Sequence, residues 1–178
     1  MIATERLILR PMTERDLVRL AHALNNFRIS RNTSRIPWPY RLDDASEYLD
    51  RLRALGSGSL WLAISHRAEP SGIAGGIGYS AGVAGHAAEI GYWLDEPYWA
   101  MGYGFEAASA IVNHAFNSTG LERLVASHHH GNGASRRILD RLGFRFTHHA
   151  LTYSRAWGHR VPTAFMELSK SEWLRTPC

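Results

Sequence analysis

The sequence predicts one domain of the α/β (α+β) class, with a mixed, mainly antiparallel twisted sheet of about seven strands flanked by about four helices. The first observation is length, because 178 residues suffice for one domain that buries roughly 70% of its unfolded surface. Residues 60–94 then show three strand patterns joined by Gly- and Pro-bearing turns, which are typical of an antiparallel meander. Finally, residues 103–117 form an amphipathic helical pattern between two further strand patterns.

The first quarter of the chain predicts a strand, a helix and a loop. Residues 5–10 alternate as a strand does, and Thr13 with Asp16 three residues later is a variant of the helix capping box. The helix that follows has its buried side at Leu17, Leu20, Ala21 and Leu24. Residues 25–41 are polar and irregular, with Pro37-Trp38-Pro39 near their end.

The remaining elements follow from the same patterns. A second helix is expected over about 43–55, ended by Gly56 as a left-handed C′ residue. The expected strands are 60–65, 73–80, 88–94, 123–128, 145–155 and 160–169, and the last two flank a Trp157-Gly158 turn. Further helices are expected over 103–117 and 133–142.

Composition excludes several classes of function. The formal net charge is +4 without any basic run, so we expect no nucleic-acid binding. The longest uncharged stretch, residues 70–88, contains six glycines and predicts a hairpin rather than a membrane helix. The only cysteine, Cys178, excludes a disulfide within the chain. The N-terminal segment carries charges and lacks the apolar core of a signal peptide, so we expect a cytoplasmic protein.

The most informative motif is Gly102-x-Gly104 at the start of the 103–117 helix. Glycines allow a tight turn, and the first N–H groups of a helix have no internal partner and carry its positive dipole end. Such a turn binds anions, and a phosphate or pyrophosphate suits it best. The buried face of the helix consists of Phe105, Ala108, Ile111, Val112, Ala115 and Phe116.

Two nucleotide motifs do not fit this turn. The dinucleotide fingerprint needs its first glycine directly after a strand, whereas residues 95–101 separate Gly102 from the expected strand end at Leu94. It also needs an acidic residue about 20 positions later, where this chain has 125–128, Val-Ala-Ser-His. A P-loop is excluded because no Lys-Ser or Lys-Thr follows the glycines.

The order of motifs around the turn resembles the GNAT acyltransferase superfamily, and most closely its RimJ/RimL-type ribosomal-protein N-terminal acetyltransferases. The motifs are Glu-Ile-Gly-Tyr-Trp-Leu at 89–94, the Gly-x-Gly turn, Asn132-x-x-Ser135 and Leu-Gly-Phe at 142–144. Residues 6–11 and 37–40 also resemble the opening strand and the substrate-side loop of that branch. The resemblance implies that residues 1–178 form a single acyl-CoA N-acyltransferase (GNAT) domain with acetyl-CoA as acyl donor.

The resemblance also implies where acetyl-CoA binds. The strands at 88–94 and 123–128 form a splayed central pair, and the pantetheine arm enters between them to meet backbone groups of Trp93, Leu94 and Asp95. The pyrophosphate is expected on backbone N–H groups of Ala100, Met101, Gly102, Tyr103, Gly104 and Phe105. This chain has Ala100 and Met101 where many relatives have glycine and a basic residue. Arg137, or its neighbour Arg136, is expected near the 3′-phosphate, and a solvated arginine is the alternative.

Two residues after the 123–128 strand receive roles from this resemblance. Asn132 is an excellent helix N-cap and is also expected beside the pantetheine. Ser135 is expected near the sulfur, where its hydroxyl can protonate the departing thiolate. Tyr92 and Tyr103 are alternative proton donors.

On the acceptor side, Glu89 is the candidate general base, acting through water, and an ion pair with an arginine is the equally weighted alternative. Glu106 lies in the first helical turn, where it complements the helix dipole. Trp38 and Tyr40 are expected to form one wall of the acceptor site, and the alternative is an aromatic packed on the core from a Pro-rich turn.

The histidine run at 128–130 does not predict a metal site. Neighbouring residues of a strand point to opposite faces, and no Cys/His set at zinc spacing accompanies the run. We expect His128 in the acceptor pocket and no bound metal; His148 and His149 meet the same objection.

The sequence therefore predicts an N-acetyltransferase that moves acetyl from acetyl-CoA to a primary amine by direct attack in a ternary complex. An α-amine, with a pKa near 8, is neutral for roughly a tenth of the time at pH 7, and a lysine amine far less. The acceptor is either a protein N-terminus or a small-molecule amine, and the protein is a monomer or a homodimer. A non-catalytic acyl-CoA sensor or interaction module is the alternative, and Glu89 with Ser135 favours the enzyme.

Overall fold

The structure, a computed structural model, describes residues 1–82 and 86–175. The described residues contain eight strands and six α-helices, with two short 3₁₀ helices at Glu14–Asp16 and Glu96–Tyr98. The strands are β1 (Ile2–Ala3), β2 (Leu7–Arg10), β3 (Leu60–His66), β4 (Gly75–Ala81), β5 (Ala87–Leu94), β6 (Arg123–His129), β7 (Arg145–Ser154) and β8 (His159–Ser169). The helices are α1 (Leu17–Leu24), α2 (Phe27–Ser30), α3 (Leu42–Arg53), α4 (Tyr103–Ser118), α5 (Gly133–Arg141) and α6 (Lys170–Trp173).

One sheet in the order β1-β2-β3-β4-β5-β6-β8-β7 runs through the molecule, and β5–β6 is its one parallel pair among the described residues. This confirms the predicted mixed and mainly antiparallel sheet. The parallel pairing joins only residues 87–89 to residues 123–125, although both strands continue well beyond it. The central pair is therefore splayed, as predicted.

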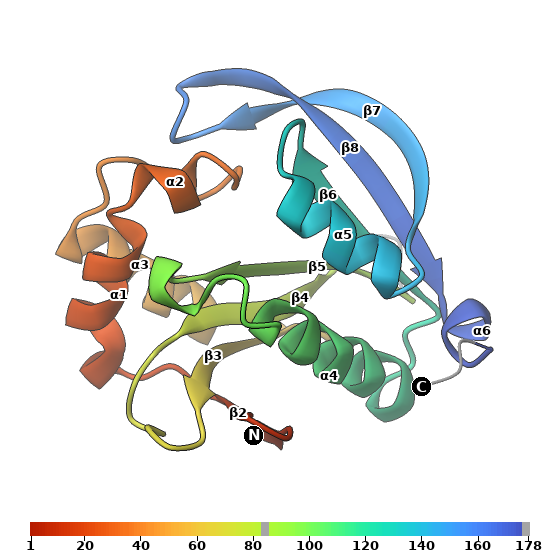
Figure 1. Cartoon of the computed structure of the whole chain (residues 1–178), viewed down its shortest axis with the longest axis horizontal. Coiled ribbons are helices and arrows are strands. Elements are labelled where there is room, and N and C mark those ends of the chain that lie inside the picture. The colour runs from red at the N-terminus through yellow and green to blue at the C-terminus, as the bar shows by residue number, and fades with distance from the viewer. Residues whose placement is uncertain (83–85, 176–178) are drawn as a thin grey trace.

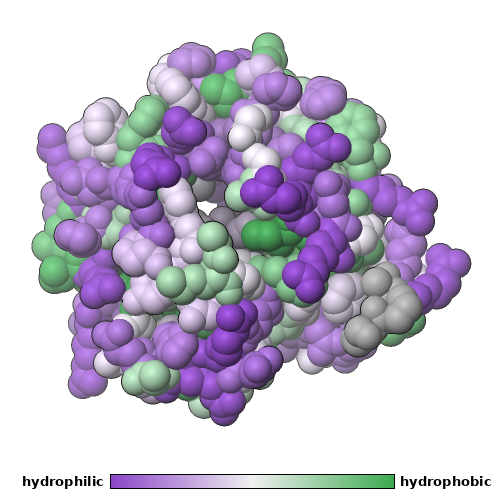
Figure 2. Space-filling view, in the orientation of Figure 1, coloured by the Kyte–Doolittle hydropathy of each residue, from purple (hydrophilic) through white to green (hydrophobic). Residues whose placement is uncertain are grey.

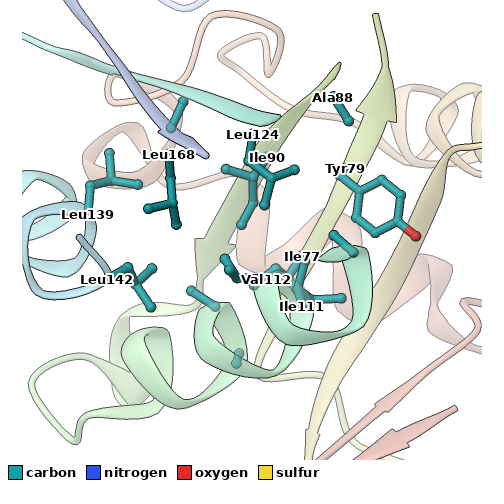
Figure 3. Packing of buried hydrophobic residues seen from close by; sticks show 14 of the residues in the cluster. Ile77, Tyr79, Ala88, Ile90, Ile111, Val112, Leu124, Leu139, Leu142 and Leu168 are labelled. Carbon is teal, nitrogen blue, oxygen red and sulfur yellow. The ribbon is translucent and has the colours of Figure 1, made fainter. Parts of the chain in front are cut away.

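The two faces of the sheet have separate hydrophobic cores. On one face, α4 and α5 cover the main core, which includes Ile90, Val112 and Leu124 (Figure 3). On the other face, a smaller core joins α1 and α3 to Trp93 through Leu20, Ala45 and their neighbours. Figure 1 shows α1–α3 grouped at one end of the molecule and the β7–β8 hairpin arching above α5 toward α2.

Four details of the sequence prediction need correction. The prediction missed β1, α2 and α6, because elements of two to four residues are too short to show a periodicity. Gly56 is not among the glycines with a positive φ, and α3 ends at Arg53 with Ala54 as its C-cap.

The expected hairpin at 70–88 is formed by β4 and β5, and residues 83–85 near its tip lie outside the described residues. Cys178 lies outside them as well. Within the described ranges, every helix is too short or too polar to cross a lipid bilayer.

Candidate active site

The site begins where the two central strands separate. Beyond Glu89 and Val125 the strands no longer pair, which leaves a gap between residues 90–94 of β5 and residues 126–129 of β6. The helices α4 and α5 begin soon after the carboxyl ends of these strands. Figure 2 shows an opening near the centre of the molecule. In Figure 1 the same region lies between α2, β5 and α5. In open α/β sheets, this is where ligands bind.

The direction of the backbone groups in β5 decides which of them face the gap. The N–H of Asp95 donates to Ala74 O at 2.9 Å, and the N–H of Gly82 donates to Ala87 O at 2.9 Å. Because hydrogen-bonded pairs alternate in an antiparallel ladder, the odd-numbered residues of β5 direct their backbone groups toward β4. Trp93 and Asp95 are therefore unsuited to be backbone anchors in the gap, and the even-numbered Tyr92 and Leu94 take that position.

Three of these residues have further structural roles. The side chain of Trp93 is buried in the smaller core. The carboxylate of Asp95 accepts from the backbone N–H of Glu96 at 2.9 Å and starts a 3₁₀ turn. Leu94 O already accepts one hydrogen bond, from the indole of Trp99 at 2.8 Å, whereas the N–H of Leu94 faces the gap and can donate to a ligand.

The Gly-x-Gly turn has the backbone geometry expected of an anion site. Gly102 is the N-cap of α4 at φ 81°, and Ala100 also has a positive φ of 60°. The N–H groups of Tyr103, Gly104 and Phe105 belong to the first helical turn, whose N–H groups have no partner within the helix. Ala100 adopts a left-handed conformation that disfavours any residue with a Cβ, so its backbone is strained.

Gly104 has a packing role in addition to its place in the turn. A Cβ at this position would lie 2.9 Å from Ile138 Cδ1 of α5 and 3.4 Å from Leu94 Cδ1. The missing side chain thus lets α4 and α5 approach each other over the end of β5. Nearby, Arg141 of α5 stacks on the Phe105 ring at 3.8 Å from its centroid.

A brace from residues 4–6, in the loop between β1 and β2, fixes this turn, and the sequence analysis missed it. Glu106 accepts hydrogen bonds from Thr4 Oγ1 at 2.5 Å, Arg6 N at 2.8 Å and Arg6 Nε at 2.7 Å. Arg6 Nη1 in turn donates to Met101 O at 2.9 Å. Burial raises the pKa of Glu106, but these hydrogen bonds outweigh it and hold the pKa below its usual range. A cation therefore lies beside the turn, although Met101 itself carries no charge.

The hydroxyls of Tyr92 and Ser135 meet beside the gap. Their oxygens are 2.8 Å apart, and Asn132 Oδ1 accepts from Ser135 N at 3.1 Å as the N-cap of α5. The capping role of Asn132 is thus confirmed. Burial raises the pKa of Tyr92 to about 12, against the opposing effect of the Ser135 hydrogen bond, so the phenol stays protonated at neutral pH. Tyr103 is not beside Ser135, because its ring packs against Arg6 and His66.

Glu89 lies on the opposite face of β5 from Tyr92. Its carboxylate pairs with Arg35 at 3.0 Å, and both side chains are largely exposed. The ion pair considered from the sequence is therefore present, and it leaves the carboxylate open to solvent.

The two aromatic residues of the Pro-rich loop have different surroundings. Trp38 is 48% exposed and packs against Phe27 of α2 with the rings tilted by 56° and their centroids 5.1 Å apart. Tyr40 is 4% exposed, donates to Asp44 O at 3.2 Å and has its pKa raised by burial. Tyr40 is therefore a core residue and not a wall of the acceptor site.

The three consecutive histidines have separate environments. His128 shares a face of the sheet with Tyr92, and its Nδ1 lies 3.1 Å from His129 O. His129 is buried, with Nδ1 2.9 Å from Arg31 O and Nε2 3.1 Å from Ser34 Oγ. Across residues 1–82 and 86–175, no group of three or more His, Cys, Asp or Glu side chains is placed to hold a metal ion.

The two adjacent arginines of α5 also differ. Arg136 pairs with Asp140 at 3.4 Å, whereas Arg137 is exposed and forms no ion pair with any residue that the structure describes. Arg137 is therefore the one of the two that is available to a phosphate.

Comparison with known proteins identifies the family and the fold of this chain. A family model described as Acetyltransferase (GNAT) domain matches residues 6–145. The uncharacterized N-acetyltransferase YoaA of Bacillus subtilis (strain 168) is 30% identical over 148 residues, which cover 81% of this chain and 82% of YoaA. RimJ of Mycobacterium smegmatis, solved in complex with CoA-disulfide, matches with a TM-score of 0.82 and 19% identity over 96% of this chain and 85% of RimJ. RimL, a ribosomal L7/L12 alpha-N-protein acetyltransferase solved with coenzyme A, matches with a TM-score of 0.81 and 18% identity over 95% of this chain and 97% of RimL.

Proposed function

This chain belongs to the GNAT acetyltransferase family, and from that premise we propose that it transfers acetyl from acetyl-CoA to a primary amine by direct attack in a ternary complex. The acceptor is a small-molecule amine or the α-amine of a protein N-terminus. The observation that carries the proposal is the pair of hydroxyls, Tyr92 and Ser135, beside a gap between two splayed strands.

The residues around the gap fit acetyl-CoA, which supplies an activated acetyl group as a thioester. The N–H groups of Tyr103, Gly104 and Phe105 are suited to the pyrophosphate, and Arg137 is suited to the 3′-phosphate. The free N–H of Leu94 can bind an amide carbonyl of the pantetheine, as a neighbouring strand would.

Ser135 and Tyr92 act as a proton relay to the leaving group. The Ser135 hydroxyl donates its proton to the departing thiolate, and the Tyr92 hydroxyl replaces it across their 2.8 Å hydrogen bond. Because burial raises the pKa of Tyr92 to about 12, the phenol is protonated at neutral pH, and after the transfer it regains its proton from solvent.

Glu89 assists removal of the proton from the amine, through water. It lies on the other face of β5, and an exposed carboxylate can exchange that proton with solvent. Glu89 increases the rate less for an α-amine than for a lysine-like amine, because the α-amine is already partly neutral at pH 7.

The experiment is a thiol-release assay with acetyl-CoA against small amines and N-terminal peptides. Ser135→Ala is expected to lower kcat about 100-fold while the Kd for CoA stays within about twofold, because a missing proton donor affects the transition state. Tyr92→Phe is expected to lower kcat by a smaller factor, and the double variant should be no worse than Ser135→Ala because the two hydroxyls act in series.

Tyr153→Phe is the matched control, since Tyr153 is an exposed tyrosine of β7. Wild-type kcat in both Ser135→Ala and Tyr92→Phe would overturn the relay. A failure to release thiol with every amine would contradict the proposed reaction itself.

A further inference from the structure

A cavity lies at the carboxyl end of β6, where that strand has left β5, and its lining reaches Gly131, which precedes the Asn132 cap on Ser135. Its volume is about 380 Å³, within the range of small-molecule sites. It is bounded by the segment after α2, the turn after β6 and the tip of the β7–β8 hairpin. The lining residues are Arg31, Asn32, His129, His130, Gly131, Trp157, His159, Val161 and Pro162.

Hydrogen bonds to backbone carbonyls hold the walls of this cavity together. Arg31 O accepts from the indole of Trp157 at 3.1 Å and from His129 Nδ1 at 2.9 Å. Ser154 Oγ donates to Thr33 O at 3.2 Å, so a second point of the hairpin is tied to the same segment. The hairpin tip and the segment after α2 thus form one connected wall, which gives the cavity a defined size.

The cavity carries positive charge without any acidic residue. None of its nine lining residues is an Asp or a Glu, and Arg31 is the one Lys or Arg among them. The neighbouring Arg28 and Arg35 are neutralised by ion pairs with Glu96 and Glu89. Arg31 forms no ion pair with any residue in the ranges 1–82 and 86–175, so its guanidinium is available to a ligand.

We propose that this cavity binds the acceptor, and that the acceptor is a small primary amine that carries a carboxylate or a phosphate. The inference rests on the proposed acetylation of a primary amine. The Arg31 guanidinium binds the anionic group through paired hydrogen bonds, and Trp157 with Val161 contacts the apolar part of the molecule.

The test measures kcat/KM for two matched pairs of acceptors in the thiol-release assay. One pair is L-phenylalanine and L-phenylalaninamide, and the other is O-phosphoethanolamine and ethanolamine, so that the carboxylate and the phosphate are tested separately. Each pair is measured with the wild type, with Arg31→Gln and with Arg19→Gln. Arg19 is an exposed arginine of α1 outside the cavity, so it controls for the lost charge.

The deciding quantity is the ratio of kcat/KM for the anionic acceptor to that for its neutral partner. The amine pKa differs within a pair but is the same for every enzyme, so it cancels when the ratios are compared. We expect Arg31→Gln to lower the ratio at least about tenfold for one pair, as the loss of a charged hydrogen bond implies, and Arg19→Gln to leave it within about twofold.

Equal ratios in the wild type and Arg31→Gln would overturn the inference while leaving amine acetylation intact. Preference for an uncharged, C-terminally amidated tetrapeptide over all four small amines would overturn it as well, in favour of a protein acceptor. If the wild type releases thiol with none of these amines and with none of the N-terminal peptides, the proposed function is contradicted and the inference falls with it. Thermal unfolding of Arg31→Gln within about 2 °C of the wild type shows that the variant is folded, because that shift corresponds to under about 1 kcal/mol.

Discussion

Replacing Glu106 by glutamine tests whether the brace between the β1–β2 loop and the Gly-x-Gly turn stabilises the protein. The glutamate accepts three hydrogen bonds at 2.5 to 2.8 Å, and its side chain is only 15% exposed. Glutamine keeps the shape but loses the charge, and its amide nitrogen cannot accept from Arg6 Nε. The loss of one charge-assisted hydrogen bond predicts a decrease of about 2 kcal/mol in the free energy of unfolding.

The assay is equilibrium urea unfolding, supported by thermal unfolding. A decrease of about 2 kcal/mol corresponds to roughly 4–8 °C in Tm for a chain of this size. Glu122→Gln is the matched control, because Glu122 is 65% exposed and lies 3.9 Å from Lys170. We expect the control to change stability by less than about 0.5 kcal/mol.

The pH dependence gives a second check with a definite sign. The pKa of Glu106 is lower in the folded than in the unfolded chain, so its contribution is fully present above the ordinary value of 4.5. The contribution is lost as the pH falls through the folded-state pKa. The stability difference between wild type and Glu106→Gln should therefore be constant at neutral pH and shrink below 4.5. A variant that behaves like the Glu122 control, or a difference that grows in acid, would refute the reasoning.

Three further substitutions probe the turn and the acceptor side. Ala100→Gly should stabilise the protein by about 0.5–1 kcal/mol in urea unfolding, because it relieves a left-handed alanine; a loss of stability would contradict this. Gly104→Ala should cost about 1–3 kcal/mol through its contact with Ile138, and Ile138→Val should restore part of that; no recovery would point away from α4–α5 packing. Glu89→Gln should slow acetyl transfer most at low pH and recover as the pH rises toward 9, whereas a loss independent of pH would mark Glu89 as a structural or orienting residue.

Local patterns in the sequence were enough to predict much of the fold. The β3–β5 meander, α4 and α5 were predictable because their periodicity and turn residues are contained in short segments of sequence. The cap of Asn132 on Ser135 was predictable for the same reason, since its partner lies three residues away.

Contacts between distant segments were not predictable in this way. The brace joins Arg6 to Glu106 across 100 residues, and nothing near either residue indicates the other. The hairpin tip is held by a hydrogen bond from Trp157 to the carbonyl of Arg31. Every residue has a backbone carbonyl, so the sequence does not indicate which one accepts this bond. Trp38 and Tyr40 lie in the same Pro-rich loop, and only the packing of the smaller core shows that one is exposed and the other is buried.

The alternation of β5 bears on the order of proton transfers in the proposed reaction. Glu89 and Tyr92 are three residues apart, about 10 Å along a strand, and they point to opposite faces of it. A proton removed near Glu89 therefore cannot pass directly to the Ser135–Tyr92 pair, so the amine and the leaving thiolate exchange protons with separate groups. It follows that the defect of Glu89→Gln can be rescued by raising the pH, which deprotonates the amine in advance. The defect of Ser135→Ala should not be rescued, because a higher pH supplies no proton to the thiolate.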